Sequence, residues 1–498
     1  MRRLWTPWAG PLLVAALAFA TRLGPLLASG TLDDAIEYDD GVYYAAAAHA
    51  LHGELPYRDF AFVHPPGVIW FALPFAAIGR VAGDVVGLAV ARIVLCAVGA
   101  LTAVLVLRLV ARIAPAWSLL AGLGYAVWRL PVLTERTLLL EPLLAVLVLA
   151  ALVLLVSPDG TRPSGRRALG AGLLVGAALA VKVWAAVAVV VLGIWLLWRH
   201  TARAWPFAGG VAAASAALVG PAALAAPGAF VEQVVRAQAQ RAAIPVPLAD
   251  RFARLGDLWS LPYATIGERA PWLLPGTAAL VLVLVVVRAW RVPAARPVVA
   301  LAAADVALVL AGPTYWYHYL AFAAPLLVVG ACAALPTPAR GPLADGSERG
   351  VWGRTAYGVG LVALVALGAL VQLRAVAPPD SPATVRAFAA AHRCTWFLTA
   401  AEEIRADVLS RNLADGCPRT PDLYAVLLAE EVTVQSGRAR VQAESAAVQA
   451  RVLVELAAAD AAVTRGTGFL DAATTTVLRT QFLQVGGEAE TLWWVRRG

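Results

Sequence analysis

The sequence predicts a polytopic α-helical membrane protein, and three observations lead to this prediction. Hydrophobic residues make up 60% of the 498-residue chain and charged residues only 14%, whereas soluble domains carry about 25% charged residues. Apolar segments long enough to cross a bilayer recur along most of the chain. The short connections between them are rich in arginine, so we interpret the net charge of +8 as a topology signal and exclude a nucleic-acid surface.

We expect about eleven transmembrane helices, because a span needs roughly 20 apolar residues. The first segment follows Met1-Arg2-Arg3 and is interpreted as an uncleaved span, not a signal peptide. The basic loops place the N-terminus inside and the C-terminus outside the cytoplasmic (plasma) membrane. Residues 67–80 are too short to span and are expected to form an interfacial or re-entrant helix. The expected spans are residues 8–28, 86–110, 116–131, 140–156, 168–182, 183–198, 205–226, 272–290, 297–313, 318–335 and 355–375.

A change of composition near residue 376 divides the chain into two expected domains. Residues 1–375 are expected to form the transmembrane domain, and residues 376–498 a small extracytoplasmic α/β domain with β-rich runs at 395–399 and 491–495. Cys394 and Cys417 lie in this second region and could form a disulfide in an oxidising compartment. The sequence leaves open whether they are paired.

The first outer loop, residues 29–85, concentrates acidic, aromatic and basic side chains directly after a span. Charges next to a bilayer are costly, so their number here indicates a functional site. Asp39 and Asp40 are candidate catalytic residues, since a carboxylate can accept a proton from a hydroxyl nucleophile. A divalent metal bound by both is also possible. The alternative is that the acids of this loop only cap and solvate it. Candidate substrate-binding residues are Tyr43, Tyr57, Arg58, Asp59 and, in a later outer segment, Tyr315.

Lys182 is the only lysine of the chain and stands at the predicted outer end of an apolar segment. An ammonium group suits phosphate, so Lys182 is a candidate anion contact; the alternative is a topological anchor. Arg92 lies on the outer side of the second span, where the positive-inside rule does not call for a cation. His64 and His318 are further outward-facing candidates. Glu141 opens the fourth span, as a catalytic acid or as a helix-start residue that favours the dipole.

Some function classes are excluded by missing motifs. The chain has no His-Glu-x-x-His zinc motif, which argues against a zinc protease, and no Gly-rich loop ending in Gly-Lys-Ser/Thr, which excludes ATP-driven transport. A lipid or sugar transporter or flippase remains the alternative to an enzyme, although the charges gather at one outer face and not near the midplane. An inert scaffold with an external binding domain is a third possibility.

The chain resembles the C-type (GT-C) membrane glycosyltransferases, in the branch of the protein O-mannosyltransferases and aminoarabinose transferases. The resemblance rests on Asp39-Asp40-x-x-Tyr43, Gly53-x-x-Pro56-Tyr57-x-Asp59 and Pro65-Pro66 in the first loop, together with Arg92, Glu141 and Lys182. It implies a GT-C fold, with Asp39 as the catalytic base. His64 stands where the aminoarabinose branch often has lysine, and Glu141 where an aspartate is frequent.

The resemblance implies transfer of a mannose- or arabinose-like sugar from a polyprenyl phosphate to a cell-envelope acceptor hydroxyl at the outer face of the membrane. Loss of the sugar leaves a more negative phosphate, which preplaced cations stabilise. Lys182 and Arg92 are the expected donor-phosphate contacts, assisted by His64 and His318. A single displacement with inversion suffices, and no soluble cofactor is required.

Overall fold

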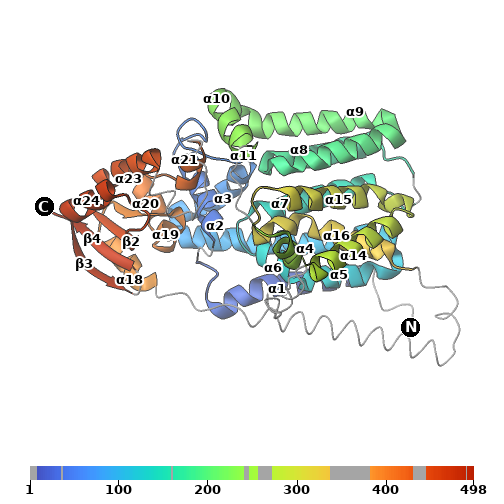
Figure 1. The fold of residues 1–498 in the computed structure, drawn as a ribbon, viewed down its shortest axis with the longest axis horizontal. Helices are drawn as coiled ribbons and strands as arrows, with labels where there is room; N and C mark the ends of the chain where they lie inside the picture. Colours follow the sequence, from blue (N-terminus) through green and yellow to red (C-terminus); the bar gives the residue numbers. More distant parts are fainter. Residues whose placement is uncertain are drawn as a thin grey trace.

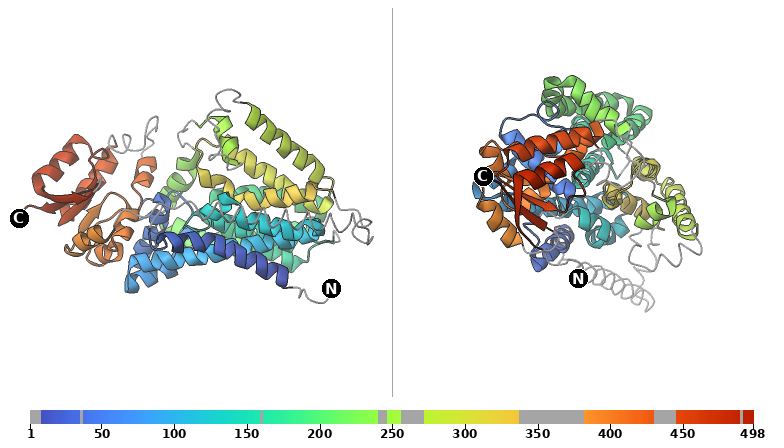
Figure 2. Two further views of the ribbon diagram at one scale, coloured as in Figure 1. Left: turned by 90° about the horizontal axis from the view of Figure 1, so that it is seen from below. Right: turned by 60° about the vertical axis from the view of Figure 1, so that its left-hand side comes forward.

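A computed structural model describes residues 8–34, 37–158, 161–239, 246–255, 272–336, 382–429, 445–488 and 491–498. Long helices of the first 336 residues run roughly side by side in a bundle, and an α/β unit formed by residues 382–498 lies at one end of it (Figures 1 and 2). Helices α2 and α3 lie between the bundle and this C-terminal unit (Figure 1). The predicted domain boundary at residue 376 falls outside the described residues.

Four described helices are long and apolar enough to cross a membrane: Ala9–Ser29, Asp84–Ile113, Val183–Ala225 and Pro293–Ala311. Shorter apolar helices accompany them. The helices of this part are α1 (Ala9–Ser29), α2 (Tyr38–Leu51), α3 (Gly67–Ala82), α4 (Asp84–Ile113), α5 (Ser118–Val127), α6 (Arg129–Thr134), α7 (Leu140–Leu155), α8 (Gly165–Val181), α9 (Ala186–Ala225), α10 (Pro227–Phe230), α11 (Ala237–Ala239), α12 (Leu248–Leu255), α14 (Leu273–Ala289), α15 (Arg296–Ala311) and α16 (Ala324–Ala334).

These helices follow the predicted segments closely, with one difference. The predicted spans 183–198 and 205–226 correspond to the two helical parts of α9, which meet at a kink at His200, where φ is −150° and ψ is 52°. The segment 116–131 is interrupted, since α5 ends at Val127 and α6 starts at Arg129. The predicted span at 355–375 lies outside the described residues, so the total of eleven stays a prediction.

The C-terminal unit contains a mixed four-stranded sheet of order β1-β2-β4-β3. Strands β1 and β2 are parallel, whereas β4 pairs antiparallel with both β2 and β3. Strands β1 and β4 coincide with the two β-rich runs of the sequence. The elements are α18 (Pro382–Ala390), β1 (Thr395–Phe397), α19 (Ala400–Arg405), α20 (Leu409–Ala414), α21 (Leu423–Ala429), α23 (Ala446–Ala458), β2 (Ala461–Arg465), α24 (Ala472–Gln481), β3 (Phe482–Glu488) and β4 (Thr491–Arg496).

A buried ion pair joins α1 to the segment after α6. The Arg22 guanidinium donates from Nε to Glu135 Oε2 at 2.7 Å, and the Tyr125 hydroxyl donates to Glu135 Oε1 at 2.6 Å. Both charged side chains are almost fully buried. Gly99 of α4 leaves room for the pair, because a Cβ atom there would lie 2.5 Å from both Arg22 Nε and Glu135 Oε2.

Replacing Gly99 with alanine is expected to destabilise the bundle by about 1–3 kcal/mol, the usual cost of overpacking a filled interior. Gly24→Ala is the matched control, because nothing lies within 4 Å of the position its Cβ would take. Thermal unfolding of both variants in detergent checks this expectation. Equal melting temperatures of the Gly99→Ala and Gly24→Ala variants would contradict this expectation, because the Arg22–Glu135 pair would then accommodate the added methyl group without loss of stability.

Candidate active site

Helix α2 turns its two neighbouring aspartates towards different surroundings. Asp39 lines a cavity at the end of the bundle that faces the C-terminal unit. Asp40 is fully buried, and its Oδ1 accepts a hydrogen bond of 2.8 Å from the backbone N–H of Leu138. Its Oδ2 lies 4.0 Å from Nε of Arg92. The structure therefore separates the predicted catalytic pair: Asp39 is available for chemistry, and Asp40 ties α2 to the bundle.

Arg92, predicted to contact the donor phosphate, instead fixes the segment that leads into α2. Its guanidinium is fully buried and does not line the cavity. It donates to four backbone carbonyls, those of Thr31 (2.6 Å), Leu32 (3.1 Å), Asp34 (2.6 Å) and Arg136 (3.2 Å). These bonds use its Nε and one terminal nitrogen, so the structure gives Arg92 a role in positioning the segment before α2 and places it outside the cavity.

Lys182 lies at the cavity wall, at the position that ends α8. Its Nζ is 2.6 Å from Oε1 of Glu141, at the start of α7. The ammonium also lies 3.9 Å from the centroid of the Trp184 ring and 4.5 Å from that of Tyr319, within cation–π range. Only 4% of Lys182 is exposed, so it does not snorkel as a topological anchor would. Glu141 itself does not line the cavity and is connected to it only by its contact with Lys182.

A close backbone contact brings His64 to the same place. A Cβ atom at Gly67, the first residue of α3, would lie 2.5 Å from the carbonyl oxygen of Ala180. Only glycine allows the start of α3 to rest on the end of α8. The Tyr57 hydroxyl donates to the His64 carbonyl at 2.6 Å, and Tyr57 itself has φ 71°. Tyr57 thus shapes the loop that carries His64 and does not line the cavity.

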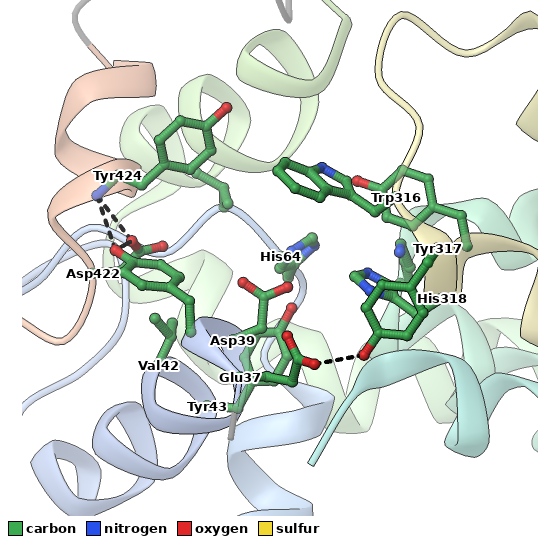
Figure 3. Close-up of a pocket in the computed structure, with 14 residues that line it drawn as sticks. Glu37, Asp39, Val42, Tyr43, His64, Trp316, Tyr317, His318, Asp422 and Tyr424 are labelled. Carbon is green, nitrogen blue, oxygen red and sulfur yellow. Dashed lines mark hydrogen bonds between the residues drawn. The ribbon is translucent and has the colours of Figure 1, made fainter. Parts of the chain in front are cut away.

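The cavity has a volume of about 140 Å³ and gathers residues from four distant parts of the chain (Figure 3). Asp39 lies between Trp316, Tyr317 and His318 on one side and Asp422 and Tyr424 of the C-terminal unit on the other. The lining residues are Glu37, Tyr38, Asp39, Val42, Tyr43, Val63, His64, Lys182, Trp316, Tyr317, His318, Tyr319, Asp422 and Tyr424. Asp39, Tyr43, His64, Lys182 and His318 were predicted as site residues.

Burial controls the protonation of the groups around Asp39. It raises the pKa of the Glu37 carboxyl, an effect that the hydrogen bond from the Tyr317 hydroxyl (2.7 Å) opposes. It also raises the pKa of Tyr43 well above its usual value, an effect that the charge of Asp39 reinforces. Tyr43 is therefore a neutral phenol at physiological pH, suited to hydrogen bonding and not to proton abstraction.

Three predicted substrate contacts lie elsewhere. Arg58 and Asp59 pair with each other at 2.7 Å on an exposed turn, and Asp59 also accepts from the backbone N–H of Leu55. Tyr315 donates to the carbonyl of Arg251 at 3.1 Å and supports the chain before the cavity wall. The structure thus gives these residues local structural roles.

Sequence reasoning missed other lining residues. Trp316, Tyr317 and Tyr319 adjoin His318, and their dense aromatic run was the available signal. Tyr38 adjoins Asp39 in the same way. Asp422 and Tyr424 come from the C-terminal unit, and no motif in the sequence around them indicates a contact with the first loop.

The possible metal site at Asp39 and Asp40 requires both carboxylates to face one ion. Their side chains diverge, since Asp40 is held by Leu138 and Arg92. Within the described residues, no group of three or more histidine, cysteine, aspartate or glutamate side chains has an arrangement suited to a metal ion. The predicted pair therefore does not fit a shared metal.

The structure joins Cys394 and Cys417 in a disulfide with a Cα–Cα distance of 5.8 Å. The bond links the start of β1 to the segment after α20. Cys96 and Cys332 are buried free thiols in the bundle. The disulfide stiffens the part of the C-terminal unit that precedes Asp422.

Lys182→Met is expected to destabilise the protein by about 3–5 kcal/mol, because it leaves the buried Glu141 carboxylate without its counter-charge. The double variant Lys182→Met/Glu141→Gln should recover most of this loss, since it removes the uncompensated charge. Thermal unfolding of the parent, both single variants and the double variant measures the coupling. Additive effects of the two substitutions would contradict an energetically important ion pair.

Comparison with known proteins places this geometry in a family. Residues 62–313, half of the chain, match glycosyltransferase family 87. No curated protein matches the sequence significantly. The fold is similar to that of ArnT from Cupriavidus metallidurans bound to undecaprenyl phosphate, at 15% identity and a TM-score of 0.54, with 98% of each chain covered. The apo form of that protein gives 16% identity and a TM-score of 0.53, with 97% of each chain covered.

These likenesses confirm the predicted GT-C architecture and a multi-pass membrane protein. They extend over both the helix bundle and the C-terminal unit, because nearly the whole length of each chain is covered. The cavity around Asp39 and Lys182 is thus embedded in a known enzyme fold, and the chain belongs to glycosyltransferase family 87.

Proposed function

We propose that the protein transfers a mannose- or arabinose-like sugar from a polyprenyl-phosphate donor to a cell-envelope acceptor hydroxyl on the outer face of the plasma membrane. The observation that carries this proposal is that Asp39 and Lys182, distant in sequence, line one cavity. The ArnT structure of the same fold was determined with bound undecaprenyl phosphate, which supports a lipid-linked phosphate donor here. The basic loops support an outward-facing cavity.

The proposed reaction is one displacement at the anomeric carbon. The acceptor oxygen forms a bond to that carbon while the bond from the carbon to the phosphate oxygen breaks, with inversion of configuration. The bonding electrons pass to the polyprenyl phosphate, and the acceptor proton passes to a carboxylate oxygen of Asp39. Asp39 suits this role because it lines the cavity, whereas Asp40 and Glu141 are occupied by structural partners.

The leaving phosphate gains negative charge during this step, and fixed cations lower the barrier by stabilising that charge. Lys182 is the proposed principal contact. Glu141 orients its ammonium, and the faces of Trp184 and Tyr319 hold the ammonium in place by cation–π contacts. His64 and His318 line the same cavity and are proposed to assist with ring N–H groups.

A transporter or flippase, the competing hypothesis, moves its cargo past a site near the bilayer midplane. The Asp39 cavity is lined instead by residues of α2 and of the C-terminal unit, and α2 lies at the end of the bundle beside that unit (Figure 1). Membership of a glycosyltransferase family also favours the enzyme.

Asp39→Asn is expected to lower sugar transfer by about 10²–10⁴-fold, the usual contribution of a positioned general base, without changing thermal stability. Asp59→Asn is the matched control, because Asp59 belongs to the same loop but lies on an exposed turn paired with Arg58. Purified protein is assayed with radiolabelled polyprenyl-phosphate mannose and polyprenyl-phosphate arabinose and an extract of envelope acceptors. Full activity of the Asp39 variant would refute the role of this carboxylate.

We further propose that the reaction needs no divalent metal, since Asp40 is unavailable to share an ion with Asp39. Dialysis against EDTA is expected to leave the transfer rate unchanged within twofold. Loss of activity on chelation that is restored by Mg²⁺, Mn²⁺ or Ca²⁺ would show that another set of ligands recruits an ion.

A further inference from the structure

The C-terminal unit contributes a wall of the cavity that no sequence motif indicates. Asp422 and Tyr424 lie across Asp39 from Trp316, Tyr317 and His318 (Figure 3). Lys182 belongs to the latter side, because its ammonium lies over the ring of Tyr319. The cavity therefore has a cationic, aromatic side and an acidic, phenolic side, with Asp39 between them.

The acidic side is held firmly against α2. The Tyr38 hydroxyl donates to Asp422 Oδ1 at 2.7 Å, and the backbone N–H of Tyr424 donates to the same oxygen at 2.9 Å. Tyr38 directly precedes Asp39 in α2. The hydrogen bond thus couples the position of Asp422 to that of the proposed base.

Three contacts away from the cavity fix the C-terminal unit on the membrane part. Arg405 pairs with Asp34 at 2.6 Å, and the backbone N–H of Ser410 donates to Asp84 at 2.9 Å. A Cβ atom at Gly41 of α2 would lie 2.5 Å from the backbone nitrogen of Ala401. These three contacts hold the C-terminal unit against the membrane part, so Asp422 and Tyr424 form a fixed wall of the cavity.

In-line displacement decides what each side binds. The nucleophile must approach the anomeric carbon opposite the leaving phosphate, and the base must reach the nucleophile. With the phosphate on the Lys182 side, the acceptor hydroxyl has to enter from the side of Asp422. The carboxylates of Asp422 and Asp39 disfavour an anionic group there, because like charges at short range repel.

We propose that Tyr38, Asp422 and Tyr424 form the acceptor subsite and that it selects an uncharged, hydroxyl-bearing acceptor over an anionic one. This inference rests on the proposed glycosyl transfer and assigns the C-terminal unit a direct part in it. Asp422 accepts a hydrogen bond from an acceptor hydroxyl, and the Tyr424 side chain supplies apolar and hydroxyl contacts beside it.

The test separates acceptor binding from donor binding. Asp422→Asn keeps the shape of the side chain and removes its charge, and Glu488→Gln is the control, an exposed acid of the same unit. Acceptors are glycolipids extracted from membranes of cells lacking the protein and divided by anion exchange into neutral and anionic fractions. Undecaprenyl phosphate is the donor-side probe, and its binding is followed by tryptophan fluorescence, since Trp184 and Trp316 adjoin the Lys182 side.

The parent protein is expected to label the neutral fraction. Asp422→Asn should raise the concentration of that fraction needed for half-maximal transfer at least about tenfold, as for loss of one charge-assisted hydrogen bond, and should increase labelling of the anionic fraction. Its affinity for undecaprenyl phosphate should stay within twofold. Tyr38→Phe, which retains the carboxylate, should show a smaller change in the same direction.

Three results would overturn the inference: preferential labelling of the anionic fraction by the parent, an unchanged requirement for acceptor in Asp422→Asn, or an equal loss of undecaprenyl-phosphate affinity in that variant. Absence of transfer by the parent to either fraction would instead reject the proposed function.

Discussion

The buried ion pair between Lys182 and Glu141 is the interaction on which the cavity depends. A charged pair removed from water persists only where geometry and further contacts compensate its desolvation. Here the compensation comes from the Trp184 and Tyr319 rings, so the start of α7, the end of α8 and the segment 316–319 are fixed together. The cation at the wall is therefore held by tertiary structure and not by a flexible side chain.

Close backbone contacts set the remaining walls. Gly67 lets α3 meet the end of α8, and Gly41 lets α2 meet α19. Arg92 donates hydrogen bonds to backbone carbonyls of the segment that precedes α2. These bonds fix the position of the helix that carries Asp39. Each of these contacts positions the backbone around the cavity without entering it. Charged residues such as Arg92 therefore support the cavity from outside and do not line it.

The membrane helices and the positions of Asp39, His64, Lys182 and His318 in one cavity were accessible to sequence reasoning. Hydropathy and the distribution of arginine report burial and topology directly, and ionisable groups near a bilayer indicate function. The separation of Asp39 from Asp40 was not accessible, because adjacent helical residues point in different directions and only the neighbouring helices decide which one is buried. The contribution of Asp422 was hidden for a related reason: it depends on how two remote segments dock.

That docking has a consequence for the order in which the molecule is made. The chain is synthesised from its N-terminus, so Asp39, His64, Lys182 and His318 are all present before the ribosome reaches Asp422. If the C-terminal unit forms part of the working chamber, as we infer, a partly translated chain holds the reactive groups in an incomplete enclosure. The enclosure would then be completed late in biogenesis, after the segment that contains the Cys394–Cys417 disulfide has folded.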